Sequence, residues 1–333
     1  MPEVPAPPPL EGLPLGRPPL APRPLGRPKQ SAAAVLMVRP ACFGFNPQTA
    51  GSNAFQHAGS EQEARTQATA LAEFERVADA LRAAGIEVLI ADDTPSPVKP
   101  DAIFPNNWVS FHGDGTVALY PMLAPNRRLE RRDDILRMVR EGGFRMSRIV
   151  DFTHHEALGK YLEGTGSLVL DRVHAVAYAC SSPRTDLDVL RDFAQQLDYH
   201  LVNFDALDAE GRPVYHTNVV MAVGSRFAIV CGESIERAAH RDAVFASLRK
   251  TGHEIVDITR AQMLRFAGNA LELAPAGGPI LVLSRTAEVS LTAAQRAQLA
   301  AHARIVAVDI PHIETVGGGG VRCMLAEIHL PKS

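Results

Sequence analysis

One pattern of predicted secondary structure repeats along the chain. In each repeat, two short apolar runs on either side of a turn are followed by a helical pattern and a third apolar run. The first full repeat runs from WVSFH, residues 108–112, to SRIVDF, residues 147–152, and three more begin near residues 167, 218 and 270. A unit of this size cannot bury its apolar face alone, so the four units are expected to stack on one another.

The two ends of the chain hold the parts of a fifth unit. Residues 32–38, AAAVLMV, are followed by a helical pattern over 61–84 and a strand pattern over 86–91, but no strand precedes them. Residues 323–330, CMLAEIHL, form a strand pattern with no helix after it. Joining the two ends would complete the fifth unit and leave no exposed sheet edge. The sequence therefore predicts an α/β fold, a five-bladed pseudo-symmetric α/β propeller built from ββαβ units.

A doubly wound parallel sheet is the alternative fold. Its phosphate-binding fingerprint, G-x-G-x-x-G after the first strand, is absent near the start of this chain. Two apolar runs before each helix also fit poorly with simple alternation of one strand and one helix. The repeat pattern therefore favours the ring.

The first 30 residues differ in composition from the rest. They are rich in proline and contain PLGRP twice. Because proline removes a backbone donor and blocks both helix and sheet, residues 1–30 are predicted to be a disordered or polyproline-like tail. The alternatives for this tail are no role and docking into an aromatic groove of a partner. Residues 31–333 are predicted to form a single catalytic domain.

Net charge and cysteine content argue against several classes of protein. The net charge of −3 indicates no nucleic-acid partner and no anionic membrane partner, and no apolar run reaches the roughly 20 residues of a membrane span. The N-terminus does not read as a secretory signal. The four cysteines form no C-x-x-C pair and no two histidines have H-x-x-x-H spacing, so a cytoplasmic protein without metal or cofactor is expected. The oligomeric state is left open, and a homo-oligomer is compatible with the sequence.

Cys323 is the first candidate for chemistry. It follows four consecutive glycines, residues 317–320, at the entrance of the last predicted strand. A free cysteine has a pKa near 8.5, and the backbone amides of a glycine loop can stabilise its thiolate or a developing oxyanion. The alternative is a small buried apolar residue, an interpretation that suits Cys180 and Cys231.

Other polar residues stand at equivalent strand entrances. His216 has the same place in its unit as Cys323 in the fifth, and Glu163 precedes a Gly-x-Gly turn and a strand. A carboxylate there could orient an imidazole, as in a catalytic triad. A third strand entrance, beside the only tryptophan, Trp108, contains Asp101, Asn106 and Asn107. Each signal has a structural alternative, since Asn, Asp and Pro also form turns. In a ring, however, these entrances would converge on one axis.

At these segments the chain resembles the pentein superfamily of guanidino-group-modifying enzymes. PDAIFPNNW, LEGTGSLVLDR, SSPRTD, YHTNVV and GGGGVRC follow one another in the order of that family's site segments, and the resemblance covers about residues 33–330. It implies a five-bladed α/β propeller, with Cys323 as nucleophile, His216 as general acid and base, and Glu163 as the residue that orients the site. The EGTG of this chain lacks the final acidic residue of the family's motif.

The resemblance also implies substrate-binding residues. Asp101 would hold the reacting nitrogens, and Arg127 and Arg184 would bind the α-carboxylate of the substrate, which suits a guanidinium fork. For Arg127 the alternative is a solvated helix start, because more arginines follow it. Residues 43–56 are a candidate lid, judged from their glycine and asparagine content.

Departures from the family pattern indicate the substrate. Asn218 stands where arginine deiminases have a carboxylate, and Asn106 and Asn107 stand where related enzymes have acidic residues. A cationic guanidinium favours carboxylates, whereas a neutral ureido group needs both donors and acceptors, which asparagine supplies.

The sequence therefore resembles the arginine deiminase-related, citrulline hydrolase (ureidase) branch. It predicts a hydrolase that converts the small amino acid citrulline to ornithine, ammonia and carbon dioxide through an S-carbamoyl-cysteine. Dimethylarginine dimethylaminohydrolase, arginine deiminase and amidinotransferase are the alternatives in that order, and a non-catalytic ligand-binding protein is the last.

Overall fold

The structure is a computed structural model that describes residues 29–58 and 63–332. Most of the predicted tail, residues 1–28, lies outside the described residues. Gln30, which was assigned to the tail, is buried in the domain, where its Nε2 donates hydrogen bonds to the carbonyl oxygens of Leu170 (2.8 Å) and Val223 (3.0 Å). The folded part of the chain therefore includes Gln30.

The strands form five separate sheets of three strands each. In spatial order the sheets are β15 (Ala326–Glu327), β1 (Ala34–Arg39) and β2 (Glu87–Asp92); β3 (Val109–Phe111), β4 (Thr116–Leu119) and β5 (Arg148–Asp151); β6 (Val169–Asp171), β7 (Val176–Cys180) and β8 (His200–Phe204); β9 (Met221–Val223), β10 (Phe227–Val230) and β11 (Glu254–Asp257); β12 (Leu271–Leu273), β13 (Ile280–Ser284) and β14 (Arg304–Val308).

All five sheets have the same topology. The middle strand pairs antiparallel with one neighbour and parallel with the other, as β4 does with β3 and β5. A short turn suffices for the antiparallel pair, whereas the parallel pair needs a crossover, which a helix supplies. The mixed α/β class and the strand–strand–helix–strand unit agree with the sequence prediction.

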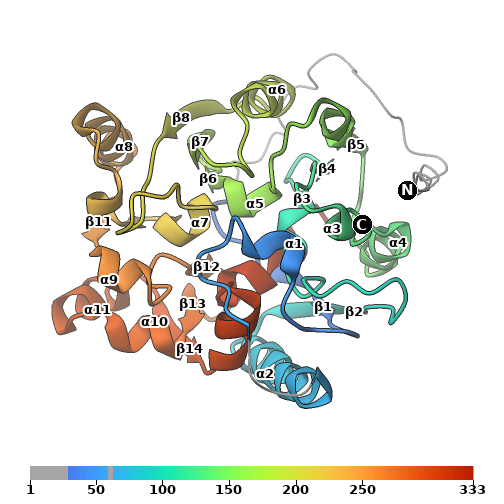
Figure 1. The fold of residues 1–333 in the computed structure, drawn as a ribbon. Helices are drawn as coiled ribbons and strands as arrows, with labels where there is room; N and C mark the ends of the chain where they lie inside the picture. Colours follow the sequence, from blue (N-terminus) through green and yellow to red (C-terminus); the bar gives the residue numbers. More distant parts are fainter. Residues whose placement is uncertain (1–28, 59–62, 333) are drawn as a thin grey trace.

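The fifth sheet is assembled from the two ends of the described chain. β15 pairs antiparallel with β1, with Glu327 opposite Val35 and Ala326 opposite Leu36. This is the pairing that the sequence predicted. The five sheets lie around a common centre, with β1 and β2 close to β3 on one side and to the strands of the last unit on the other (Figure 1).

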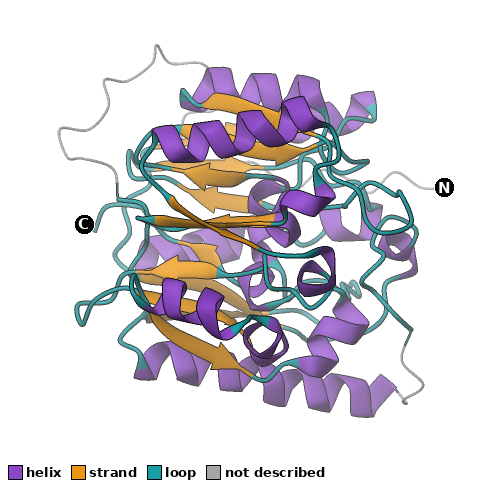
Figure 2. Cartoon of the chain, turned by 90° about the vertical axis from the view of Figure 1, so that its left-hand side faces the viewer, coloured by secondary structure: helices purple, strands orange, loops and turns teal. Residues whose placement is uncertain are grey.

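The longer helices lie on the outside of the sheets, whereas several short ones, among them α1, α5 and α7, lie near the centre (Figures 1 and 2). The outer helices are α2 (Glu63–Ala83), α4 (Asp133–Glu141), α6 (Leu187–Leu197), α8 (Ala238–Lys250), α10 (Arg285–Ser290) and α11 (Ala293–Ala300). The short ones are α1 (Pro47–Ala50), η1 (Pro105–Asn107), α3 (Pro125–Arg128), η2 (Thr153–Leu158), α5 (Gly164–Ser167), α7 (Thr217–Val220), η3 (Gly232–Ser234), α9 (Arg260–Met263), η4 (Ile313–Gly317) and η5 (Val321–Met324). Within the described ranges, no helix combines the length and apolar character that crossing a membrane would require.

β1 shows how the core is built. Val35 and Met37 share one buried cluster with Phe74 of α2, while Leu36 shares another with Trp108 of the neighbouring unit. The strand is therefore buried on both faces. This explains its continuous apolar run, which is typical of strands covered on both sides.

The first strand of each unit, which begins near the centre, is shorter than the sequence pattern predicted. β15 has two residues instead of the expected run, and Cys323 lies in the one-turn helix η5 before it. A one-turn helix, α7, also separates His216 from β9. Next to the centre these backbone groups bond within a single turn, as in the bond from the Leu168 amide to the Gly164 carbonyl. Local bonds of this kind satisfy buried backbone groups that have no ladder partner.

Candidate active site

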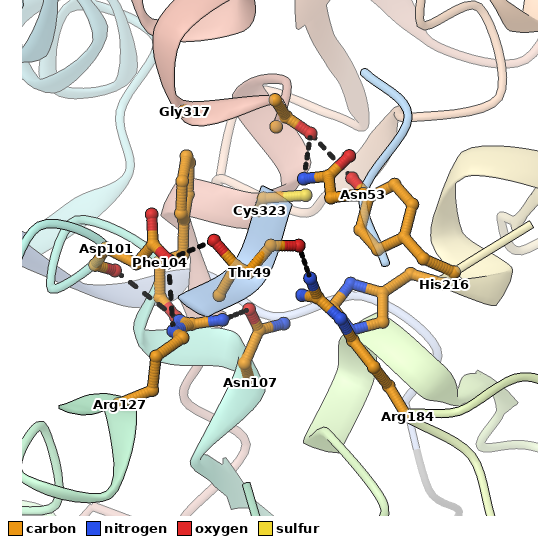
Figure 3. Close-up of a pocket in the computed structure, with 13 residues that line it drawn as sticks. Thr49, Asn53, Asp101, Phe104, Asn107, Arg127, Arg184, His216, Gly317 and Cys323 are labelled. Atoms are coloured by element: carbon orange, nitrogen blue, oxygen red, sulfur yellow. Dashed lines mark hydrogen bonds and ion pairs between the residues drawn. The ribbon is translucent and has the colours of Figure 1, made fainter. Parts of the chain in front are cut away.

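A narrow pocket opens at the common centre of the five sheets, where several of the one-turn helices meet (Figure 3). Its walls come from segments that are far apart in the sequence. The lining residues are Thr49, Asn53, Asp101, Phe104, Asn107, Arg127, Arg184, Tyr215, His216, Gly317, Gly318, Gly319 and Cys323. Six predicted site residues, Cys323, His216, Asp101, Asn107, Arg127 and Arg184, thus line one pocket. Glu163, Asn106 and Asn218 lie directly behind this lining.

Cys323 presents its sulfur to two side-chain amides. The Nδ2 atoms of Asn269 and Asn218 lie 3.2 Å and 3.5 Å from its Sγ. Burial raises the pKa of the Cys323 thiol above its ordinary value, while the Asn269 hydrogen bond and the charge of Arg322 act in the opposite direction. Without other charges in the pocket, the thiol is therefore the favoured form at neutral pH.

The glycine run next to Cys323 is required by close packing. Gly318 has φ +64°, a left-handed conformation that favours glycine, and a Cβ there would lie 2.6 Å from Asn53 Nδ2. A Cβ on Gly317 or Gly319 would lie within about 3 Å of the Phe104 ring. The carbonyl of Gly318 accepts hydrogen bonds from Tyr215 Oη (2.6 Å) and Asn53 Nδ2 (3.2 Å). The run therefore folds into the pocket wall as a fixed turn.

His216 and Glu163 form a buried pair. His216 stands at the N-cap of α7 and Glu163 at the N-cap of α5, which are equivalent positions in adjacent units. The Nε2 of His216 lies 2.9 Å from Oε2 of Glu163. Burial would raise the pKa of Glu163, but Arg184, His216 and Arg127 together hold it well below its usual range. Since the carboxylate is ionised, Nε2 of His216 carries the proton and Nδ1 is free to accept one.

Burial also affects His216. It lowers the pKa of the imidazole to about 4, with the Glu163 hydrogen bond acting against this shift. At neutral pH these shifts favour a neutral imidazole and a neutral thiol, with one transferable proton on the sulfur.

Arg127 is buried and fully engaged. Its Nε and Nη2 bond both oxygens of Glu130 (2.8 and 2.9 Å), and its Nη1 donates to Oδ1 of Asn107 (2.8 Å). The alternative of a solvated helix start is wrong, since Arg127 is only 2% exposed. Burial raises the pKa of Glu130 to about 7, although the charge and hydrogen bonds of Arg127 act to lower it.

Arg184 connects the site to the segment 43–56. It donates to Oε2 of Glu163 (3.3 Å), to the carbonyl of Thr49 (2.9 Å) and to Oγ of Ser52 (2.8 and 3.0 Å), and its guanidinium lies over the ring of Tyr215. The segment that the sequence suggested as a lid therefore lies against the pocket and is held there partly by Arg184.

Asp101 and the neighbouring asparagines carry unused polar atoms. Oδ2 of Asp101 accepts from Asn46 Nδ2 (2.7 Å) and Thr49 Oγ1 (3.2 Å). Asp101 Oδ1, Asn107 Nδ2 and both amide atoms of Asn106 are buried and have no hydrogen-bond partner within the described residues. Leaving such a group unpaired costs about 1–3 kcal/mol, so their concentration at one pocket indicates a polar ligand.

Several residues of this region were missed at the level of sequence, and three of them hold site residues in place. Asn269 contacts the sulfur, Glu130 holds Arg127, and Asn46 holds Asp101. A signal for Asn269 was available, because it stands two residues before β12 and thus at the strand entrance of its unit. Glu130 and Asn46 lie in irregular segments, where the repeat pattern offers no guide.

A potential metal-binding cluster lies away from the pocket. Among the residues that the structure describes, the ligand atoms of His154, His155 and Asp192 lie within 4.8 Å of one another. The group sits at the outer surface between η2 and α6, and Nε2 of His155 already contacts Asp192 at 2.9 Å. It is not connected with Cys323 and His216.

Five α/β units around a buried cysteine, histidine and glutamate define a class of protein, the pentein superfamily of guanidino-group-modifying enzymes, and the resemblance seen in the sequence is confirmed. Residues 39–330 match the profile of the family described as N,N dimethylarginine dimethylhydrolase, eukaryotic. The chain belongs to this family. A search of curated proteins found no match.

Solved structures show the same fold at low sequence identity. The N-terminal domain of ArgZ, described as an arginine dihydrolase from Cyanobacteria and bound to its substrate, superposes with a TM-score of 0.69 at 16% identity, covering 89% of this chain and 99% of that one. A mutant of AgrE in complex with L-arginine gives 0.67 at 16% identity, covering 90% and 40%. A dimethylarginine dimethylaminohydrolase adduct with S-methyl-L-thiocitrulline gives 0.63 at 17% identity, covering 89% and 100%.

Proposed function

We propose that the protein is a cysteine-dependent hydrolase of a ureido or guanidino amino acid, and that citrulline is its substrate. The observation that carries the proposal is the joint presence of the Cys323 sulfur and the His216–Glu163 pair at one buried pocket. We also infer that the five units are the blades of a closed pseudo-symmetric propeller. Membership in a family named for dimethylarginine hydrolysis supports C–N bond hydrolysis in general.

The charge balance of the pocket supports citrulline. Glu163 lies 3.3 Å from Arg184 and 3.8 Å from Arg127, and Oδ2 of Asp101 lies 3.7 Å from Arg127. Two arginines thus face these two carboxylates and Glu130, whose pKa burial raises to about 7, so the group has no net charge when Glu130 carries a proton. Citrulline is a zwitterion with no net charge, whereas arginine and dimethylarginine bring an additional positive charge that the pocket would have to compensate.

The unused polar atoms fit a ureido group. Asp101 Oδ1 is an acceptor and Asn107 Nδ2 is a donor, and neither has a partner within the described part of the chain. A ureido group presents N–H donors and one carbonyl acceptor, so it could satisfy both atoms.

Binding of the α-carboxylate would require Arg184 or Arg127 to exchange partners. Arg127 is held by a bidentate contact to Glu130, while Arg184 is held partly by Ser52 and the Thr49 carbonyl. The contacts of Arg184 to a hydroxyl and a carbonyl are weaker than contacts to a carboxylate. Arg184 is therefore the better candidate, and its release would loosen the segment 43–56 as substrate enters.

The proposed reaction begins with transfer of the thiol proton. Cys323 gives its proton to Nδ1 of His216, and the thiolate attacks the ureido carbon to form a C–S bond. The bond from this carbon to the side-chain nitrogen then breaks, and the His216 imidazolium donates its proton to the departing nitrogen. The products of this step are ornithine and an S-carbamoyl-cysteine.

Hydrolysis completes the cycle. Neutral His216 takes a proton from a water molecule, which attacks the carbamoyl carbon, and the C–S bond breaks to leave a Cys323 thiolate. The thiolate regains its proton from His216. The released carbamate decomposes to ammonia and carbon dioxide, so that all atoms of the ureido group are accounted for.

Hydrolysis of a guanidinium, as in arginine or dimethylarginine, is the second candidate. Burial raises the pKa of the Cys323 thiol, and a bound cation would help to form the thiolate in a way that neutral citrulline does not. The structural relatives described above also include an arginine dihydrolase.

A product assay separates the candidates. Citrulline, arginine and dimethylarginine are supplied separately, and the amino-acid products are identified by chromatography, with Cys323→Ser as the inactive control. We expect ornithine from citrulline and no turnover of the other two. Formation of citrulline from arginine or dimethylarginine would replace this proposal by the second candidate, and failure of all three substrates would favour a ligand-binding protein.

A further inference from the structure

Each of the five units contributes one equivalent position at or directly beside the pocket, and four of the five are polar. Asn107, Gly166, Asn218, Asn269 and Cys323 each stand two or three residues before the first strand of their unit. The ring brings these equivalent positions together at its centre. Gly166 illustrates the crowding, since a Cβ there would lie 2.4 Å from Asn107 Nδ2 and 2.8 Å from two atoms of the His216 ring.

Two of these positions place amides against the nucleophile. Asn269 Nδ2 lies 3.2 Å and Asn218 Nδ2 lies 3.5 Å from Cys323 Sγ, and the thiol itself can donate to Oδ1 of Asn218 at 3.9 Å. All three residues are buried, with Asn269 and Asn218 at most 1% exposed. Water therefore cannot replace these contacts easily, and the amides are the polar groups that the sulfur faces.

The orientation of the Asn269 amide is determined by its surroundings. Its Nδ2 also donates to the backbone carbonyl of Asn218, at 3.0 Å. A carbonyl only accepts hydrogen bonds, so this atom of Asn269 has to be the nitrogen, and a flipped amide would place two oxygens together. Asn269 therefore presents a donor, not an acceptor, to the sulfur.

Gly320 leaves space for the Asn269 amide. Oδ1 of Asn269 is buried and has no hydrogen-bond partner among the described residues. A Cβ on Gly320 would lie only 2.6 Å from this oxygen. The last glycine of the run thus leaves the space that the Asn269 amide needs beside Cys323.

We propose that Asn269 is a catalytic residue that, together with Asn218, binds the thiolate form of Cys323. A donor stabilises a thiolate more than a thiol, because hydrogen bonds to an ionised acceptor are about twice as strong as those between neutral groups. The assignment deepens the proposed function and rests on it only for the identity of the substrate.

This assignment complements the proton transfer described above. When the proton leaves Sγ for Nδ1 of His216, a negative charge appears on a buried sulfur. Asn269 and Asn218 already point their N–H groups at that position, so little rearrangement is needed. The same donors stabilise the sulfur as the leaving group when the S-carbamoyl bond breaks.

The test measures thiol reactivity and needs no substrate. The rate of Cys323 alkylation by iodoacetamide is followed from pH 5 to pH 10 by mass spectrometry of the labelled peptide, in the wild type and in Asn269→Ala and Asn269→Asp. We expect the pH midpoint to rise by one unit or more in both variants, with at least a tenfold lower rate at pH 7. Asn203→Ala is the matched control, since Asn203 donates to the Ala179 carbonyl at 3.0 Å and should leave the midpoint unchanged.

Cys180 and Cys231 report on folding in the same samples, because both are buried and should remain slow. If they become reactive in Asn269→Ala, Gly320→Ala is the second variant, which displaces the amide and keeps Asn269. An unchanged Cys323 midpoint in a folded variant would overturn the assignment. A shifted midpoint without turnover of any amino acid would retain it and reject the proposed function.

Discussion

At the scale of single residues, the hydrogen bonds around Glu163 explain which groups of the site carry protons. One carboxylate accepts from the Leu123 amide (3.1 Å), from Arg184 (3.3 Å) and from His216 (2.9 Å). Because these donors keep it ionised, it determines which imidazole nitrogen carries the proton. In the proposed reaction, Glu163 would therefore act through His216.

Glu163→Gln is expected to lower turnover. A glutamine cannot accept from both the Leu123 amide and His216, so the imidazole loses its orientation. General acid–base catalysis contributes about 10²–10⁴-fold, and we expect kcat to fall by a factor in this range. Ornithine formation between pH 5 and pH 9 measures the effect. Glu314→Gln, at a buried carboxylate outside the pocket, should retain activity. Near-normal turnover of Glu163→Gln would contradict the role assigned to this residue.

At the scale of elements, the one-turn helices at the strand entrances position the chemistry. α5 and α7 begin at Glu163 and His216, and η5 contains Cys323. Each has only one turn, so a side chain at its start points toward the centre while the strand that follows runs outward. Close packing around these helices also explains why glycine occurs at particular positions inside them.

Gly166→Ala tests the packing of α5. Its Cβ would lie 2.8 Å from Nδ1 and Cε1 of His216, so the imidazole has to move away from its productive position. We expect turnover to fall at least a hundredfold, since small displacements of a catalytic group have effects of this size. Gly51→Ala is the matched control, because Gly51 has φ −65° and nothing within 4 Å of the added Cβ. Equal activity of the two variants would exclude the predicted clash.

At the scale of the whole molecule, the buried histidines make stability dependent on pH. Burial lowers the pKa of His216 and of His329 to about 4, below the value of roughly 6.5 in an unfolded chain. Between these values the unfolded state binds protons that the folded state does not, so the free energy of unfolding falls as the pH is lowered from about 6.5 to 4. Glu163 and Glu327, whose pKa values are held well below the usual range, add to this loss below about pH 4.5.

His329→Gln should therefore flatten the pH dependence of unfolding. His329 contacts Glu327 at 3.2 Å, with Arg172 and Arg322 nearby. Urea unfolding at pH 7 and pH 5 should show a loss on acidification that is smaller in the variant by about 2 kcal/mol, the value for 1.5 pKa units. His154→Gln, at an exposed histidine, should behave like the wild type. The same slope in His329→Gln and the wild type would argue against a neutral buried His329.

Prediction from sequence succeeded where the repeat pattern carried the information. The apolar periods indicated five units and the pairing of the chain ends. The predicted equivalence of His216 and Cys323 was inexact, because Asn218 stands three residues before β9 as Cys323 stands three residues before β15, whereas His216 stands five before β9. Prediction from sequence failed for the strand lengths and side-chain contacts at the centre of the fold. The run after Cys323 reads as a long strand, yet β15 has two residues, because the backbone there bonds within single turns. The burial of Arg127 was left open, since its partner Glu130 lies in the same charged run as three further arginines, which the structure shows to be partly exposed.

The linear order of residues was sufficient to predict the class of fold, because the spacing of apolar residues indicates which faces of the helices and strands are buried. It was also sufficient to nominate a cysteine, a histidine and a glutamate, because a repeated unit gives each residue a defined place. The contacts of the site needed the folded ring. Asn269 and Cys323 are 54 positions apart, and their 3.2 Å contact exists only because the fourth and fifth units meet at one axis. Charge balance, burial and the direction of each amide depend on such contacts between distant segments, and no local pattern encodes them.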